Sequence, residues 1–516
     1  MKRNVYSLVI IVTLTLLSGC GNKEEMEMNE QTDLNVNQNT QEERKEINKL
    51  FVNAENAWIG DVMAFSDENG IYLNYLYETD QNDIAYHPIY RFFTSDFCTF
   101  YDEGEVIPYG MELESPDLAV GTGSFIRAMD GTYHCFYTGH NDKADSLGID
   151  KECIMHAKSN DNVNWEKIPE DTFYAPEGYS SNDFRDPFVM WNEEENCYWM
   201  LLGAKKDNEE GSCIVKYLST DLTEWSFEEI FYDNNDLYYM ECPDLFQIND
   251  WYYLTFSWNN VTYYRMAKTI NGPWIKPEID TFDGNAFYAA KTVEYKGTRY
   301  LVGFLDRKKG ENDDLAYTWA GSICPYELTQ YDDGLLGVKM PSQYMEQYFT
   351  KPFICNEIDR SKHVFNDENK LNFIANDEIE YLKYQTLPNS MLLSCTMKIN
   401  SFSEHAKFGF VFGIEKDALK SYPVMMDFNH SILCYDGYKE DFDSDSDIRN
   451  QQSFLFEEDK EYTLKLVVEN EVVILYVDDK KVLSNRIYHA VGKDWGFFAQ
   501  NADVEISNLS LYVPQE

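Results

Sequence analysis

The chain has 516 residues, of which 44% are hydrophobic and 16% aromatic, so it is long and apolar enough for a large buried core. Its 90 acidic and 43 basic residues give a formal net charge of −47 at pH 7. A charge of this sign argues against nucleic acid or an anionic lipid surface as a partner, and it favours neutral or cationic ligands.

The N-terminal segment has the features of a bacterial lipoprotein signal. Lys2 and Arg3 precede an apolar run over residues 8–17, which is too short to span a bilayer as a helix. Small residues stand directly before Cys20, as cleavage of such a signal requires. We therefore expect residues 1–19 to be a signal peptide and Cys20 to carry lipid, anchoring an extracytoplasmic protein to the cell membrane. The alternative is an ordinary buried N-terminal helix.

Residues 20–46 are polar, rich in Glu, Asn and Gln, and free of aromatic side chains. Such a segment cannot bury enough surface to fold, so we predict a disordered tether. Ten cysteines follow Cys20, and none forms a C-x-x-C pair. This pattern indicates neither a zinc site nor a compact disulfide framework, and we interpret these cysteines mostly as small buried hydrophobic residues. One or two disulfides remain an alternative in an exported protein.

A turn followed by a strand with an aromatic residue near its start recurs five times. A second element, in which Asp or Asn precedes Trp or Phe by three or four positions, falls between the copies at 96–100, 161–165, 221–225 and 271–274. Repeats of this kind, at somewhat more than the roughly 40–50 residues of a four-stranded blade, are typical of a β-propeller. We predict an all-β fold whose residues 47–348 form a five-bladed β-propeller. The repeat tyrosines are spaced by 61, 65, 54 and 48 residues: Tyr72, Tyr133, Tyr198, Tyr252 and Tyr300.

Three of the five repeats carry a carboxylate upstream of the tyrosine. Asp61, Asp186 and Glu241 precede their tyrosines by eleven, twelve and eleven residues, while the other repeats have Thr122-Gly123 and Ala289-Ala290 there. Because the innermost strands of a propeller line one channel, residues at corresponding positions converge in it. The spacing therefore predicts three acidic side chains that face one another at one end of the channel.

Such a cluster suits the hydrolysis of glycosides. Clustered carboxylates repel, so one should hold a proton near neutral pH while another stays ionised. A retaining glycosidase uses an ionised nucleophile and a protonated acid roughly 5 to 5.5 Å apart, and a third carboxylate can hold sugar hydroxyls. Carboxylates also bind calcium, and residues 443–447 begin like a calcium loop, but the glycine and the closing glutamate of such a loop are missing. We expect no metal ion and no cofactor.

At these residues the chain resembles glycoside hydrolase family 32, the family of invertases, levanases and inulinases, from about Trp58 to the C-terminus. Phe184–Pro187 is similar to the R-D-P motif of the family, and Met240–Phe246 is similar to its E-C motif. The resemblance implies a β-fructofuranosidase or fructanase that acts on a fructose-containing carbohydrate by double displacement. The implied site consists of Asp61 as nucleophile, Asp186 as transition-state stabiliser, Glu241 as acid/base, and Trp58, Ser124, Arg185 and Trp319 as substrate-binding residues.

The chain departs from the family pattern beside the expected nucleophile. The W-M-N-D-P-N-G segment of the family is W-I-G-D-V-M-A at residues 58–64, and its W-S-G-S segment is G-T-G-S at residues 121–124. Gly60 offers no side-chain amide near Asp61, which bears on the choice of substrate. Two alternatives follow: an arabinanase-type propeller glycosidase, and a non-catalytic surface lipoprotein that captures sugars. Phosphorylated sucrose is not the expected substrate, because an exported enzyme meets the sugar before uptake.

Alternation of apolar and polar residues beyond Tyr348 predicts a C-terminal β-sandwich over residues 349–516. Strands are expected at 462–468, 473–477 and 504–511, with turns at Asp478-Asp479 and Asn501-Ala502. The stretch from Val473 to Tyr488 also looks like the C-terminal domain of the family. This domain could shield the edges of the propeller or add a surface that binds sugar, and the sequence leaves both roles open.

Overall fold

A computed structural model of the chain describes residues 45–79, 86–207, 211–234, 237–376, 378–414, 420–439 and 449–515. The predicted signal peptide, Cys20, the predicted tether up to residue 44 and the calcium-like segment at 443–447 lie outside these residues. In the part of the chain that is described, no helix has the length and apolar character needed to cross a bilayer. The ten later cysteines all lie among the described residues and none of them forms a disulfide; every one except the half-buried Cys355 is buried.

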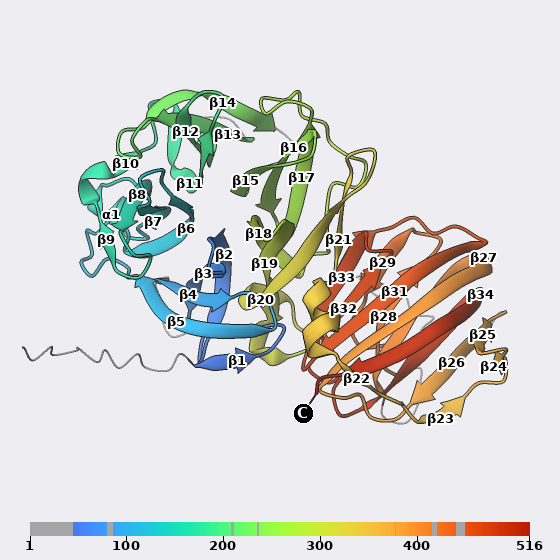
Figure 1. The fold of residues 1–516 in the computed structure, drawn as a ribbon. Helices are drawn as coiled ribbons and strands as arrows, with labels where there is room; N and C mark the ends of the chain where they lie inside the picture. The colour runs from blue at the N-terminus through green and yellow to red at the C-terminus, as the bar shows by residue number, and fades with distance from the viewer. Residues whose placement is uncertain are drawn as a thin grey trace, which may run out of the picture. The chain divides into compact units, whose positions relative to one another are not determined.

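The first part of the chain forms the predicted propeller, whose blades surround a central channel (Figure 1). Blade 1 gains β1 at its outer edge, and β1 begins at Glu46, where the tether was expected to end. The short helix α1 (Ala144–Leu147) and a 3₁₀ turn (Pro169–Asp171) lie within blade 2. The strands of the first two blades are β1 (Glu46–Asn48), β2 (Trp58–Ser66), β3 (Ile71–Glu78), β4 (Ile89–Thr94), β5 (Thr99–Ile107), then β6 (Ala119–Arg127), β7 (Tyr133–His140), β8 (Glu152–Ser159), β9 (Trp165–Lys167) and β10 (Phe173–Tyr174).

The remaining blades complete the ring, because β2 of blade 1 pairs with β20 of blade 5 through Ile59 and Gly321. Blade 4 has three regular strands and two isolated bridges, from Tyr263 to Thr281 and from Met266 to Ile275. The strands of blades 3 to 5 are β11 (Tyr179–Asn192), β12 (Cys197–Lys206), β13 (Ser212–Ser219), β14 (Ser226–Asn234), then β15 (Glu241–Ile248), β16 (Trp251–Trp258), β17 (Val261–Ala267), then β18 (Phe287–Tyr295), β19 (Thr298–Lys308), β20 (Tyr317–Gln330) and β21 (Leu336–Lys339).

Both recurring sequence elements have a structural cause. The five turn–strand repeats are the hairpins that join the first and second strands of each blade. The second element is the turn that follows the third strand of a blade, as in blade 2, where Asp161 accepts the backbone N–H groups of Val163 and Asn164 at 2.9 and 2.8 Å. The tryptophan that follows packs against the preceding blade, as Trp225 does against Phe136 with ring centroids 5.3 Å apart. The repeats therefore encode a turn and an interblade contact.

The predicted sandwich follows the propeller, and its longest strands, β27 and β34, pair along most of their length. Asp478 and Asp479 form the expected turn, with φ values of 56° and 52°. The turn expected at Asn501-Ala502 is wrong: Asn501 has a φ of 50° but stays within β34, because β27 continues to pair on both sides of it. A π-helix (Tyr344–Tyr348) precedes the strands, which are β22 (Lys351–Pro352), β23 (Glu357–Arg360), β24 (Val364–Asp367), β25 (Lys370–Ile374), β26 (Ile379–Tyr384), β27 (Ser390–Ile414), β28 (Tyr422–Asp427), β29 (Ile432–Tyr435), β30 (Asn450–Ser453), β31 (Lys460–Glu469), β32 (Val472–Val477), β33 (Lys481–Arg486) and β34 (Asp494–Val513).

The last blade is fixed to the sandwich by buried polar contacts. Arg486 of β33 donates hydrogen bonds to the carbonyl oxygens of Leu305 and Asp306 at 3.1 and 2.9 Å. The backbone N–H of Ser484 donates to the Asp283 carboxylate at 3.0 Å. Because these groups are buried, each contact satisfies a polar group that would otherwise be costly to desolvate. These contacts hold β19 and the segment between β17 and β18 against the sandwich.

Candidate active site

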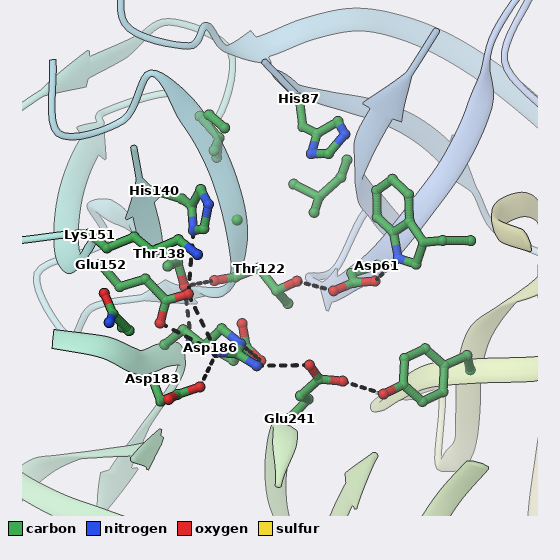
Figure 2. Close-up of a pocket in the computed structure, with 18 of the residues that line it drawn as sticks. Asp61, His87, Thr122, Thr138, His140, Lys151, Glu152, Asp183, Asp186 and Glu241 are labelled. Carbon is green, nitrogen blue, oxygen red and sulfur yellow. Dashed lines mark hydrogen bonds and ion pairs between the residues drawn. The ribbon is translucent and has the colours of Figure 1, made fainter. Parts of the chain in front are cut away.

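A cavity of about 660 Å³ lies at the channel, where the first strands of the blades converge. Five of the seven residues predicted for catalysis and substrate binding line it: Asp61, Arg185, Asp186, Glu241 and Trp319. Figure 2 shows the three predicted catalytic carboxylates around the same space, each from a different blade. The convergence expected from the repeat spacing is therefore present.

A β-bulge in the first strand of every blade aims these side chains into the channel. The pairing register shifts after Ile59, Val120, Arg185, Glu241 and Tyr288, so that each strand carries one extra residue. The three carboxylates are not strictly equivalent: Asp61 is the second residue of its bulge, Asp186 is the first, and Glu241 directly precedes its bulge. Asp186 has a φ of 65°, in the left-handed region that few non-glycine residues adopt. A bulge redirects a side chain, which explains why carboxylates up to two positions apart still converge.

Asp61 is held by donors from three other blades. Its Oδ1 accepts the indole N–H of Trp319 at 3.2 Å, and its Oδ2 accepts the hydroxyl of Thr122. The Cys242 thiol lies 3.6 Å from the same Oδ2. These contacts leave the carboxylate little rotational freedom, as positioning of a nucleophile requires.

Asp186 is the most enclosed of the three carboxylates, with 4% of its surface exposed. Its Oδ2 accepts the backbone N–H of Cys242 at 2.9 Å, and its own N–H donates to the hydroxyl of Thr138 at 2.9 Å. Burial raises the pKa of Asp186 to about 7; Arg185 opposes the shift, whereas Glu241 and Asp61 add to it. The cluster thus holds a proton near neutral pH, and this titration belongs to the interacting carboxylates together.

Glu241 is bound on both of its oxygens. Arg185 donates to Oε1 from Nη2 at 2.9 Å, and the hydroxyl of Tyr288 donates to Oε2. Burial, followed by the negative charge of Glu241, raises the pKa of Tyr288 above its ordinary value, so Tyr288 stays protonated and remains a donor. The sequence placed Tyr288 beside the fifth repeat position without giving it a role. The feature of the sequence that could have identified Tyr288 is its position directly before Ala289-Ala290, the residues at the fifth repeat position.

Arg185 joins Glu241 to a second set of polar residues. Its Nη1 lies 3.4 Å from both oxygens of Glu152, and its guanidinium stacks over the ring of Tyr239 at 3.8 Å. Glu152 also accepts the backbone N–H of Phe184 at 2.8 Å and lies 3.3 Å from His140. The hydrogen bonds to Glu152 and Asp142 raise the pKa of His140, although its burial opposes this. Sequence reasoning missed Glu152 as a site residue because it belongs to β8, a third strand, which does not line the channel in the simple repeat picture.

Two predicted substrate-binding residues lie outside the cavity. The Ser124 hydroxyl accepts the backbone N–H of Val189 at 2.9 Å, so it joins the first strands of blades 2 and 3 in the buried interior. Trp58 begins β2, and the Arg307 guanidinium lies 4.8 Å from its ring centroid. Substrate binding by Trp58 and Ser124 stays a prediction, and neither residue is part of the cavity lining.

The chain is similar to known glycoside hydrolases. The family model described as Glycosyl hydrolases family 32 N-terminal domain matches residues 51–335. The sequence is 31% identical over 228 residues to the sucrose-6-phosphate hydrolase of Escherichia coli, covering 40% of this chain and 46% of that protein. It is 25% identical over 249 residues to the levanbiose-producing levanase of Geobacillus stearothermophilus, covering 45% and 52%. The matched region spans about half the length of these curated relatives.

The fold is similar to those of solved structures over nearly the whole chain. Fructan 1-exohydrolase IIa from Cichorium intybus gives a TM-score of 0.70 at 15% identity, covering 90% of this chain and 97% of that chain. Sucrose-6-phosphate hydrolase from Lactobacillus gasseri gives 0.67 at 17% identity, covering 89% and 91%. At such identities the likeness establishes the fold, which confirms the predicted propeller and sandwich. Since the family model covers more than half of the sequence, including all three carboxylates, this chain belongs to glycoside hydrolase family 32.

Proposed function

We propose that this protein is a retaining glycosidase that cleaves fructosyl linkages by double displacement. The observation that carries the proposal is the convergence of Asp61, Asp186 and Glu241 in one cavity, each held by specific donors. This reaction requires at least two carboxylates that flank the glycosidic bond, and a third can stabilise the charge that develops on the sugar. Sugar capture without catalysis would not require donors that fix all three.

In the first step, a carboxylate oxygen of Asp61 attacks the anomeric carbon of the fructosyl unit while Glu241 donates its proton to the departing oxygen. The carbon–oxygen bond to the leaving group breaks as an ester to Asp61 forms. In the second step Glu241 takes a proton from water, whose oxygen attacks the same carbon and releases Asp61. Arg185 and Tyr288 orient Glu241 for both proton transfers.

Asp186 would bind hydroxyls of the fructosyl ring. With 4% of its surface exposed and its backbone tied to Thr138, it has a fixed position, which suits recognition of one sugar geometry. Fixed polar groups that strengthen their contacts in the transition state supply most of the rate enhancement in such sites. We assign it no covalent role, because Asp61 supplies the nucleophile.

The substrate we propose is neutral. Five carboxylates line the cavity, whereas its lining ammonium and guanidinium groups are those of Lys151 and Arg185, and Arg185 is already engaged by Glu152 and Glu241. A phosphate would meet net repulsion there. Relatives of this chain are named sucrose-6-phosphate hydrolase and levanase, and the substrates in these names share a fructosyl linkage. Sucrose, fructo-oligosaccharides, levan and inulin therefore come first as candidates.

The test is reducing-sugar release from sucrose, inulin, levan and arabinan by the chain without its signal, compared with an Asp61→Asn variant. Fructose released by the parent and lost in the variant would support the proposal and name the substrate. Activity on arabinan alone would assign the chain a different furanoside. Sugar binding without release from any substrate would make capture the better account.

We also propose that the protein is secreted and anchored by lipid on Cys20, on the strength of the basic start, the apolar run and the small residues before Cys20. A Cys20→Ser variant should move from the membrane fraction into the soluble fraction of the bacterial cells that produce it. Mass spectrometry of the N-terminal peptide should find the acylated cysteine in the parent. An unmodified N-terminus that retains residues 1–19 would contradict this.

A further inference from the structure

The first strand of blade 5, β18, carries a lysine that the proposed mechanism does not use. Lys291 directly follows the β-bulge of this strand, and only 4% of its surface is exposed. It does not line the catalytic cavity. Lysine is rarely buried to this extent, because its ammonium group loses hydration unless other groups compensate for the loss. The presence of this charge inside the propeller therefore calls for an explanation.

The ammonium group of Lys291 lies among the first strands of blades 3, 4 and 5. It donates a hydrogen bond to the carbonyl oxygen of Pro243 in β15 at 3.2 Å. It also lies 5.8 Å from the centroid of the Phe188 ring in β11. Both contacts are to neutral groups, so neither cancels the positive charge of the lysine. This charge therefore acts on the ionisable groups around it, and the low dielectric of the interior strengthens the effect.

The hydrogen bond to Pro243 holds a backbone bulge. The pairing register of β15 shifts between Glu241 and Asp244, and Pro243 lies within this bulge. Strand β18 contacts both ends of the bulge as well: the Tyr288 hydroxyl donates to Glu241, and a backbone N–H donates to the Asp244 carboxylate at 2.5 Å. Lys291 supplies the contact between these two. Because Pro243 has no N–H, its carbonyl is the only backbone group of this residue that can form a hydrogen bond.

Cys242, the residue before Pro243, connects this bulge to both aspartates. Its backbone N–H donates to Asp186 at 2.9 Å, and its thiol lies 3.7 Å from Asp186 and 3.6 Å from Asp61. Burial raises the pKa of the thiol, Asp186 and Asp61 raise it further, and the charge of Lys291 opposes them. The thiol therefore stays protonated and can donate to the carboxylates. Lys291 thus acts on the group that contacts the expected nucleophile and the expected stabiliser.

The carboxylates of the site outnumber the positive charges close to them. Arg185 is shared between Glu241 and Glu152, so its charge serves two partners. A further positive charge nearby favours the ionised form of a carboxylate. Lys291 provides such a charge from inside the propeller, whereas Arg185 lines the cavity. The ionisable groups that face this region are Asp61 of β2, Arg185 and Asp186 of β11, and Glu241, Cys242 and Asp244 of β15.

We propose that Lys291 is a positioning residue of the reaction, which holds the bulge beside Glu241 and favours the ionised form of the Asp61 nucleophile. This inference rests on the proposed function and adds to it a residue that does not touch the substrate. Its two parts can be separated by experiment. The first part needs a hydrogen-bond donor at this position, and the second needs a positive charge.

The test is the pH dependence of kcat/KM for the preferred fructoside, measured for the parent and for three variants. Lys291→Met has neither donor nor charge, Lys291→Gln has a donor without charge, and Lys291→Arg has both. The acidic limb of such a profile reports the pKa of the group that must be ionised. Loss of a positive charge raises the pKa of a carboxylate, so the limb should move to higher pH by about one unit in Lys291→Met and Lys291→Gln. In Lys291→Arg the limb should stay where it is in the parent.

Activity at the pH optimum tests the hydrogen bond to Pro243. In Lys291→Met kcat should fall roughly 10- to 100-fold with a smaller change in KM, because the bulge is displaced while no substrate contact is lost. Lys291→Gln and Lys291→Arg should each recover part of this loss. An acidic limb that does not move in Lys291→Gln, or parental activity in Lys291→Met, would overturn the inference. If Lys291→Met does not fold, the other two variants decide by themselves.

The matched control is Lys216→Met. Lys216 is a buried lysine of β13 in blade 3 that pairs with Glu229 at 2.7 Å and does not line the cavity. Its replacement should lower the melting temperature and leave the acidic limb in place. A shift of the limb in this control as large as in Lys291→Gln would also overturn the inference. Absence of fructose release from the parent would overturn the proposed function and this inference with it, whereas release with a limb that no Lys291 variant moves would overturn this inference alone.

Discussion

The indole ring of Trp319 fills the space that a side chain at position 60 would need. A Cβ built on Gly60 lies 2.3 Å from Cζ2 and 2.4 Å from Cη2 of Trp319, far inside van der Waals contact. The same indole donates its N–H to Asp61 at 3.2 Å. The sequence lacks a side-chain amide beside Asp61, and the structure supplies a donor there from blade 5.

Trp319→Phe keeps most of the ring and removes the N–H donor. Loss of a hydrogen bond to an ionised carboxylate costs about 1.5–3 kcal/mol, so we expect kcat/KM on the preferred fructoside to fall roughly 10- to 100-fold. Steady-state kinetics on purified variants measures this. Trp191→Phe is the control, because Trp191 packs against Tyr198 and does not line the cavity. Equal activity of both variants would show that Trp319 does not position Asp61.

Glu241→Gln keeps the shape of the side chain but cannot deliver a proton. We expect cleavage of an alkyl fructoside, such as sucrose, to slow by about 10² to 10⁴. A fructoside with an activated aryl leaving group should be much less affected in its first step, because that oxygen needs little protonation. Comparing the two substrates in pre-steady-state measurements tests the role directly. The same loss on both substrates would argue against a general-acid role.

Asp186 should make the fold less stable as pH rises. Its pKa is raised by burial from 3.8 to about 7, so its contribution to stability is full below pH 4 and is lost as pH increases through 7. Asp186→Asn stays neutral throughout. Between pH 5 and pH 8 the melting temperature of the parent should therefore fall further than that of the variant, by roughly 3 °C or more. Parallel curves would show that Asp186 is not protonated in the folded protein.

Arg185→Lys retains the charge but loses the planar donors that join Glu241 to Glu152. Lysine cannot reproduce this geometry or the stacking on Tyr239, so we expect kcat/KM to fall about 10². Arg127→Lys is a suitable control, since Arg127 pairs with Glu68 at the surface and such pairs contribute little. A comparable loss in the control would point to a general effect of replacing arginine.

Ser124→Ala distinguishes a structural role from substrate binding. Removal of the buried hydroxyl leaves the backbone N–H of Val189 without its acceptor, which costs about 1–3 kcal/mol of stability. We expect a lower melting temperature with KM unchanged. A raised KM at an unchanged melting temperature would indicate that Ser124 contacts the substrate.

Much of this site was accessible from local sequence patterns. The turn residues and the tryptophans that pack between blades recur because each blade needs the same short-range hydrogen bonds and the same contact with its neighbour. The repeat register located Asp61, Asp186 and Glu241 to within one residue. The offset between them could not be predicted, because each bulge depends on how its strand pairs with the next one.

The sequence by itself determined the number of blades, the sandwich and the three carboxylates, since these follow from periodicities of a few residues or from one repeated unit. Only the tertiary structure decided that Ser124 is buried between blades, that Tyr288 and Trp319 donate to carboxylates of other blades, and that β30 meets the propeller beside the active site. Those contacts join residues 47 to 258 positions apart. They are set by the packing of whole sheets, which no local pattern records.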